Sequence, residues 1–404
     1  MVIVEFFGRT PIDNMVATLV NRPDTVIFVG NPKLMKKSDP VFRRFLAATG
    51  NTATRIRYEE IRSHDFHEIV TLLDRLASEY PDCHFDITGG APMVLAAIGV
   101  IYERYRSRGI ELHQYNLRTG KVYDCDLNGI SVSGELPQLT VAQSILLHGG
   151  SVVPDRKSPP WDMSKDFCRD IFALWNICKT DCSGWNRRIS ALNSLRPEPT
   201  AHALELSTPL PAGSDSLRLD HMLRRMEREG LLSELTLTDS RLHLRYKNRQ
   251  VRQSLEKAGN ILELYTCAVA RSITDTDGRP CYQDSAVGVS IDWDGIIHSH
   301  QTGKVDTKNE IDVILMHGAI PVFISCKNGM VEEDELFKLN TVAEHFGGRY
   351  VKKVLVATTL GKKTQRSRQY FLERARDMGI TVIAGVHKLP EPEFRERLRT
   401  LTDI

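Results

Sequence analysis

The stretch from residue 309 to residue 329 reads NEIDVILMHGAIPVFISCKNG, and it decides the fold of the C-terminal part of this 404-residue chain. Two apolar runs flank Met316–Ala319, so the stretch predicts a β-hairpin with Asp312 on its first strand and Lys327 on its second. A carboxylate can hold a divalent cation, while a neighbouring ammonium orients water or offsets developing negative charge. The hairpin therefore indicates a site for metal-assisted phosphodiester cleavage.

Length and composition limit the class of protein. With 404 residues, 41% of them hydrophobic and 26% charged, the chain is predicted to form two or three globular domains. A formal net charge of +2 argues against a generally basic coat for nucleic acid. The absence of a long apolar run and of a leader segment predicts a cytoplasmic protein without membrane contact. The eight scattered cysteines are expected to be reduced thiols.

Residues 1–148 alternate between strand and helix patterns, which is typical of a doubly wound, Rossmann-like α/β domain. Loops that follow the strands of such a sheet open at the edge where ligands bind. The expected strands are 1–7, 25–29, 54–57, 84–87 and 110–117, and the expected helices are 14–21, 40–49, 65–79 and 91–108.

Three glycine-containing loops of this domain are candidate ligand-binding segments. They lie at 8–11, 30–33 and 88–92, each after a predicted strand. Glycine lets the backbone approach a ligand closely, and the amides that open the next helix can receive a phosphate. A tight strand-to-helix turn without a ligand is the alternative interpretation. The candidate residues are Gly8, Arg9, Thr10, Asn31, Lys33, Thr88, Gly89, Gly90 and Ala91.

Residues 149–250 are predicted to form a small linker subdomain. The segment 151–160 is rich in proline and charge and is typical of a linker, and 196–215 is expected to be irregular because four prolines interrupt it. Helices are expected at 164–178, 185–195 and 216–229, followed by a hairpin of 233–237 with 242–246. A helix followed by a hairpin resembles the end of a winged helix. The favoured alternative is a connecting subdomain that sets the spacing of its neighbours.

Residues 251–404 are predicted to begin with a single helix, 251–272, which carries Glu263 in an apolar stripe. Strands are expected at 287–293 and 295–300 before the hairpin, then a helix at 331–346, a strand at 353–358, a helix at 365–378 and a strand at 381–384. Glu310 lies two residues before Asp312, so the two carboxylates share a strand face. Glu335 is a candidate to face the same cleft.

This order of elements, with Asp312 and Lys327 on a central hairpin, resembles the restriction-endonuclease-like superfamily, written PD-(D/E)xK. The resemblance covers roughly residues 251–385 and implies an α/β nuclease domain. It implies catalytic roles for Asp312, Lys327 and Glu263, with Mn²⁺ or Mg²⁺ bound by Asp312 and Glu263. Glu310, on the same strand face as Asp312, is a further candidate catalytic residue and metal ligand, and the backbone carbonyl of Cys326 is a candidate to supply another oxygen.

Ser325 departs from that pattern, because the family has glutamate or aspartate at this place. A serine hydroxyl is a poor ligand for a hard divalent cation, so metal affinity should fall unless another acid fills the space. Glu310 is the best candidate for that acid. The site could also be natural but weak, or the serine could be an inactivating substitution.

The two ends of the chain together resemble the CRISPR-associated Rossmann fold (CARF) nucleases of type III CRISPR defence. The segment DITGGAPM at 86–93 is similar to the sensor motif of that family, and the 309–329 hairpin carries the nuclease likeness. The resemblance implies cyclic tetra-adenylate as activator and DNA, RNA or both as substrate. A ring with two-fold symmetry suits a homodimer, whose nuclease domains are expected to respond through the linker.

Two alternatives from other classes remain. The first is a non-catalytic cyclic-nucleotide sensor or DNA-binding regulator with a degenerate nuclease fold, which Ser325 favours. The second is a nucleotide-binding α/β enzyme. This second alternative ranks last, because the N-terminal loops lack the dinucleotide glycine fingerprint and an obvious pairing of a nucleophile with a base.

Overall fold

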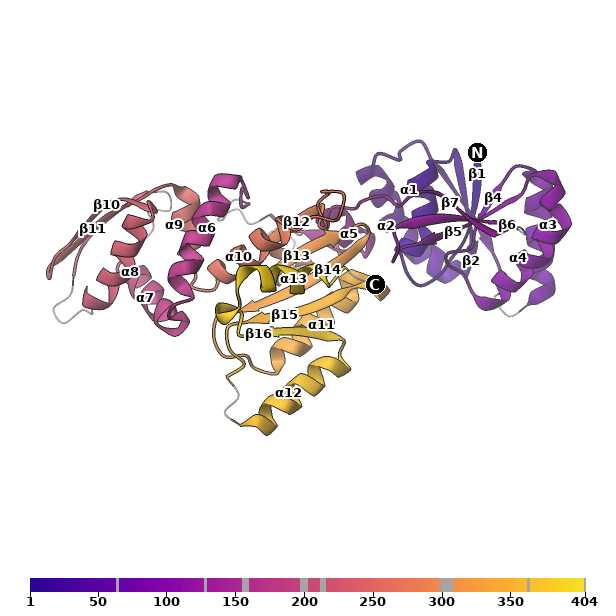
Figure 1. Ribbon diagram of the computed structural model, residues 1–404. Helices are drawn as coiled ribbons and strands as arrows, with labels where there is room; N and C mark the ends of the chain where they lie inside the picture. The colour runs from indigo at the N-terminus through magenta and orange to yellow at the C-terminus, as the bar shows by residue number, and fades with distance from the viewer. Residues whose placement is uncertain are drawn as a thin grey trace.

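The computed structural model describes the chain except for residues 63–64, 127–128, 155–159, 197–202, 211–215, 297, 299–307, 362–363 and 403–404. Its described residues contain three β-sheets, of seven, three and six strands. Figure 1 shows the C-terminal part, in orange and yellow, between the N-terminal domain and the magenta middle subdomain. The mixed α/β class predicted from the sequence is confirmed, while the boundaries 1–148, 149–250 and 251–404 stay predictions.

The N-terminal sheet has the order β3-β2-β1-β4-β5-β6-β7. Strands β1 to β5 are parallel, as predicted, but β6 and β7 extend the sheet antiparallel and were not predicted. Apolar side chains of β1 and β2 pack against α1, α2 and α5 on one face and against α3 and α4 on the other. The elements are β1 (Val2–Phe6), α1 (Val16–Asn21), β2 (Thr25–Gly30), α2 (Pro32–Ala48), β3 (Arg55–Glu60), α3 (Phe66–Glu79), β4 (His84–Asp86), α4 (Pro92–Tyr105), β5 (Glu111–Asn116), β6 (Lys121–Asp126), β7 (Gly129–Glu135) and α5 (Val141–Leu147).

Helix α2 begins eight residues before the predicted start at Pro40. Asn31 caps it, because its side chain accepts hydrogen bonds from the backbone N–H groups of Lys33 and Leu34 at 3.0 and 3.4 Å. Pro32 occupies the first turn, where a missing N–H costs nothing. The helix continues through Pro40, so that proline is an interior residue.

The middle subdomain ends with a helix followed by a hairpin, as the sequence predicts. Its three-stranded sheet, β10-β11-β9, follows two helices, and α8 lies between β9 and the β10–β11 hairpin. Strand β9 corrects the expectation of an irregular segment at 196–215, where 197–202 and 211–215 lie outside the described residues. The elements are α6 (Lys165–Cys178), α7 (Cys182–Ser194), β9 (Glu205–Pro209), α8 (Ser216–Arg228), β10 (Leu232–Leu237) and β11 (Arg241–Tyr246).

The C-terminal sheet has the order β16-β15-β14-β13-β12-β8. Strand β8 comes from the segment expected to be a linker and pairs antiparallel with β12, while 155–159 lie outside the described residues. Helix α13 was not predicted. The elements are β8 (Ser151–Val152), α9 (Arg249–Ser254), α10 (Asn260–Arg271), β12 (Asp284–Asp292), β13 (Lys308–His317), β14 (Ile320–Lys327), α11 (Asp334–Gly347), η3 (Gly348–Tyr350), β15 (Lys352–Ala357), α12 (Gln365–Asp377), β16 (Ile380–Ala384) and α13 (Glu391–Arg399).

Two predictions for this part were wrong. The helix expected at 251–272 is divided into α9 and α10, because side chains of α7 bind carbonyl groups at the break. The indole N–H of Trp185 donates to the Ala258 carbonyl at 3.2 Å, and the amide of Asn193 donates to the Leu255 carbonyl at 3.1 Å. The strand expected at 295–300 is absent at its described residues, 295, 296 and 298.

The N-terminal domain packs directly on the C-terminal domain. One apolar core joins α2 and α5 to α11, with Phe45, Ile145 and Phe346 fully buried in it. The Val141 N–H also donates to the Asp284 carboxylate at 2.7 Å. The middle subdomain lies at the far end of the molecule (Figure 1), so the prediction that it spaces the two larger domains is wrong.

Candidate active site

The predicted hairpin forms as β13 and β14, with Gly318 at its turn in a left-handed conformation (φ +59°) that favours glycine. Val313 pairs with Ile324, so Asp312 lies across from Ser325, and Lys327 follows two residues later on the same face of β14. The Lys327 Nζ atom lies 3.8 Å from the Asp312 Oδ2 atom. The structure thus brings together the two residues on which the sequence prediction depended.

Ser325 and Cys326 both contact the carboxylate of Asp312. The Cys326 backbone N–H donates to Asp312 Oδ2 at 2.6 Å, and the Ser325 hydroxyl donates to the same atom at 3.2 Å. Burial raises the pKa of Asp312, although Lys327 and these two donors oppose the rise. The serine therefore orients the aspartate, and no described hydrogen bond occupies the Oδ1 atom.

Lys327 also contacts Glu335, in the first turn of α11. Their charged atoms are 2.9 Å apart, and Glu335 lies 3.1 Å from Lys338 as well. Burial lowers the pKa of Lys327, but Asp312 and Glu335 raise it by more, so the ammonium stays charged. This contact places Glu335 beside Lys327 of the candidate site.

Glu263 enters the site from the first turn of α10. Burial, followed by repulsion from Asp312 and Glu310, raises the pKa of Glu263 to about 8. Glu310 is more than half exposed and lies 3.8 Å from Lys257, and a cavity of about 380 Å³ is lined by both Glu263 and Glu310. Three converging carboxylates that repel one another are a donor set that fits a hard divalent cation such as Mn²⁺ or Mg²⁺.

The side chain of Cys326 does not face the carboxylates as a ligand would. Its Sγ atom is buried 3.7 Å from the Thr266 hydroxyl, and burial, with Asp312 and Glu263 nearby, keeps the pKa of its thiol far above the usual value. A neutral thiol is a poor metal ligand. Metal binding by the backbone carbonyl of Cys326 stays a prediction.

The predicted sensor loops meet at a second cavity, of about 360 Å³, at the carboxyl ends of β1 and β2. Thr10, Lys33, Thr88 and Gly89 do not line it. Lys33 lies instead in the first turn of α2. The predicted residues that line the cavity are Gly8, Arg9, Asn31, Gly90 and Ala91.

Two glycines of these loops are required by the packing. A Cβ atom on Gly30 would lie 2.6 Å from the Cβ atom of Phe7, and a Cβ atom on Gly90 would lie 2.6 Å from that of Phe6. Gly90 also has a φ of +106°. Both positions therefore exclude larger residues, and they leave the backbone exposed to the cavity.

The buried Asp86 and strand β5 support Thr88 of the Thr-Gly-Gly loop through hydrogen bonds. The Thr88 N–H donates to the Asp86 carboxylate at 2.8 Å, and the Thr88 hydroxyl accepts a hydrogen bond from the Tyr115 N–H at 2.8 Å. Burial raises the pKa of Asp86 to about 7, and burial together with Asp86 raises that of Glu5 well above its usual value. Thr88 thus supports the loop.

Sequence reasoning missed a contact between the sensor loops and the C-terminal domain. Asp13, next to Gly89, is buried, and burial raises its pKa to about 6 against the opposing effects of Thr10, Arg349 and Tyr350. The last two residues belong to η3 of the C-terminal domain. No sequence signal points to this contact, because it depends on how two distant segments pack.

Comparison with known families adds the decisive observation for the C-terminal part. Residues 250–401 match the model of the Card1-like endonuclease domain. This part of the chain is similar to a Card1-like endonuclease domain. No curated protein sequence matches the chain.

Solved structures with the same arrangement show the fold of the whole chain. The crystal structure of protein VC1899 from Vibrio cholerae matches with a TM-score of 0.73 and 17% identity, over 100% of this chain and 98% of that one. Can2 from Sulfobacillus thermosulfidooxidans, in complex with cyclic tetra-adenylate, matches with a TM-score of 0.64 and 15% identity, over 100% and 99%. A type III CRISPR defence DNA nuclease activated by cyclic oligoadenylate matches with a TM-score of 0.50 and 14% identity, over 89% and 45%.

Together with the endonuclease domain, these likenesses give the chain the architecture of a CARF nuclease, as its sequence predicts. Among the described helices, none combines the length and the hydrophobicity needed to cross a bilayer.

Proposed function

We propose that this protein is a metal-dependent nuclease of type III CRISPR defence. Its activator is a cyclic oligoadenylate, and the ring is cyclic tetra-adenylate. The observation that carries the proposal is the site of the Card1-like endonuclease domain, where Asp312 lies 3.8 Å from Lys327. The shared core between this domain and the sensor domain supports regulation by a ligand. The similarity to Can2 supports the choice of ring.

In the proposed reaction Asp312, Glu263 and Glu310 hold Mn²⁺ or Mg²⁺. When bound, such a cation supplies Lewis-acid stabilisation of the phosphate and lowers the pKa of a water. Lys327 keeps its ammonium charged beside Asp312 and offsets negative charge on the scissile phosphate. Glu335 positions Lys327 through their 2.9 Å ion pair.

Activation is proposed to pass directly between the domains. The ring's phosphates would lie against the loops with Gly8 and Gly90, and two copies of the chain would present these loops to its two halves. Asp13 is next to one of these loops and close to Tyr350 of the endonuclease domain. The ring can shift the equilibrium between two domain arrangements only to the extent that it binds one arrangement more tightly than the other.

The test is incubation of the full-length protein with supercoiled plasmid, single-stranded DNA and RNA, with Mn²⁺ and with or without cyclic tetra-adenylate. Calorimetry on the same preparation measures binding of the ring. Cleavage that depends on the ring is expected. Binding without cleavage of any substrate would refute the nuclease activity while leaving the sensor role intact.

A second candidate function, a DNA-binding regulator with a degenerate nuclease site, is favoured by Ser325 and by the helix followed by a hairpin that ends the middle subdomain. Replacing Ser325 with Glu separates the two candidates, because a carboxylate is a far better ligand for Mn²⁺. For a competent site, Ser325→Glu is expected to raise Mn²⁺ affinity about tenfold or more and to increase cleavage. Ser325→Ala is the matched control, and unchanged metal binding in Ser325→Glu would favour the regulator.

A further inference from the structure

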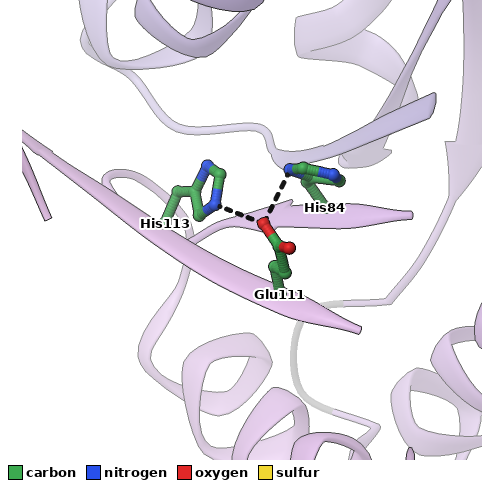
Figure 2. Close-up of side chains that lie close together, drawn as sticks. All are labelled: His84, Glu111 and His113. Atoms are coloured by element: carbon green, nitrogen blue, oxygen red, sulfur yellow. Dashed lines mark hydrogen bonds and ion pairs between the residues drawn. The ribbon is translucent and has the colours of Figure 1, made fainter. Parts of the chain in front are cut away.

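Three side chains converge on one face of the N-terminal sheet, away from the proposed nuclease centre. His84 begins β4, Glu111 and His113 lie on β5, and Asp124 lies on β6. Residues two apart on a strand share a face, so Glu111 and His113 point the same way. The register pairs His84 with Glu111, which brings the first three together, and it pairs His113 with Asp124. Figure 2 shows the first three around a common centre.

The spacing of the donor atoms suits a small tetrahedral ion. The Glu111 Oε2 atom lies 3.4 Å from His84 Nδ1 and 3.1 Å from His113 Nε2, and His113 Nε2 lies 3.3 Å from Asp124 Oδ1. With zinc–ligand bonds of 2.0–2.1 Å, the edges of a tetrahedral shell are about 3.3 Å long. The two edges that join Glu111 to the histidines are close to this length, and the ligand atoms of His84, Glu111 and His113 all lie within 4.8 Å of one another.

His84 presents an unpartnered ring nitrogen to the cluster. Its Nδ1 atom is buried and lacks a described hydrogen-bond partner, and its ring centroid lies 4.9 Å from that of His113. The lone pair of a neutral imidazole is the donor that a metal requires.

The surroundings of the cluster also resemble those of a built metal site. His113 is mostly buried, and its Nδ1 atom lies 3.5 Å from the Tyr115 hydroxyl, which accepts a hydrogen bond from Asn21 at 2.6 Å. Such outer contacts fix the ring of a metal-binding histidine. The Glu111 side chain is 56% exposed, which gives an ion a path from solvent.

We infer that His84, Glu111 and His113 bind a divalent transition-metal ion of the zinc class, with Asp124 beside His113. Two imidazole nitrogens with a carboxylate select zinc over Mg²⁺ or Mn²⁺, which prefer oxygen ligands. The ion links β4 to β5, next to the antiparallel extension of the sheet that begins at β6. Its role is to stabilise the N-terminal domain, and this inference does not rest on the proposed function.

The experiment uses the full-length protein carrying Asp312→Asn, which weakens metal binding at the nuclease centre. After treatment with a chelator, it is titrated with Zn²⁺ by calorimetry, and Co²⁺ is added to detect the visible absorption of a tetrahedral site. One zinc ion per chain, tetrahedral cobalt bands and a higher melting temperature with zinc are expected.

Two variants in the same background assign the binding to this cluster. His113→Gln and the more exposed Glu111→Gln are each expected to weaken zinc binding at least tenfold and to abolish the gain in melting temperature. His243→Gln, which alters a histidine–glutamate ion pair on β11, is the matched control and should bind zinc normally. Failure of the parent to bind zinc, or unchanged binding in a folded Glu111→Gln protein, would overturn the inference.

Discussion

Three acidic side chains meet at the endonuclease centre, and three others lie buried near the sensor loops, but the two groups differ in how they hold charge. In the endonuclease domain Asp312 lies beside Lys327, and Glu263 and Glu310 line a cavity. Under the sensor loops, Glu5, Asp13 and Asp86 are buried, and burial raises the pKa of each. The first arrangement suits a cation. The second is easily protonated, so it can support loops that receive an anion without repelling it.

The largest effect that would separate the two sites is expected from removing a carboxylate that serves only as a ligand for the cation. Asp312→Asn is expected to reduce cleavage about 100-fold or more, because loss of a metal ligand removes several kcal/mol of transition-state stabilisation. Binding of cyclic tetra-adenylate should be unchanged, since the sensor cavity is elsewhere. Cleavage rates and calorimetry measure the two effects.

The control for that variant is Asp377→Asn, which alters an exposed acid of α12. It should cleave as the parent protein does. If Asp312→Asn cleaved at the wild-type rate, the proposed nuclease centre would be contradicted.

The sensor side of the contrast is tested by Gly90→Ala. The added methyl group would lie 2.6 Å from Phe6 Cβ at a φ of +106°, so the Thr-Gly-Gly loop must shift or be strained by about 1–3 kcal/mol. Affinity for cyclic tetra-adenylate is expected to fall about tenfold, as measured by calorimetry, while Mn²⁺ binding at the endonuclease centre stays the same.

Gly99→Ala is the matched control, because a Cβ atom there meets no atom within 4 Å. Equal ring affinity for Gly90→Ala and Gly99→Ala would contradict the placement of the ring at this loop.

The smallest expected effect is on pH-dependent stability. The folded-state pKa of Asp86, about 7, lies above its ordinary value of 3.8, so the protonated acid stabilises the fold and this contribution is lost as pH rises through 7. The melting temperature of the protein should fall between pH 5 and pH 8. In Asp86→Asn, whose amide does not titrate but still accepts the Thr88 N–H, the fall should be smaller.

Thermal unfolding in the presence of a chelator measures this difference and keeps the histidine cluster free of metal. Asp377→Asn, with an exposed acid, is expected to keep the pH dependence of the parent. The same slope in Asp86→Asn and the parent would show that Asp86 is ionised throughout.

The sequence was enough to place the hairpin and its two charged residues, because alternation and the turn around Gly318 are local properties. The break between α9 and α10 escaped prediction, because side chains such as Trp185 from another helix bind the carbonyl groups there. Asn31 looked like a ligand residue but caps α2 while lining the cavity.

The histidine cluster shows the same limit of sequence reasoning. Glu111 and His113 are two apart on a predicted strand, which alone indicates a shared face. Their meeting with His84 and Asp124 depends on the pairing of β4 with β5 and of β5 with β6. A single sequence does not specify that register, and β6 itself was not predicted.

The most direct measurement is plasmid cleavage by the wild-type protein with Mn²⁺, compared with and without cyclic tetra-adenylate. Cleavage is expected only when both are present, with Asp312→Asn inactive under the same conditions. Equal cleavage with and without the ring, in a preparation that calorimetry shows to bind it, would contradict a ligand-activated nuclease.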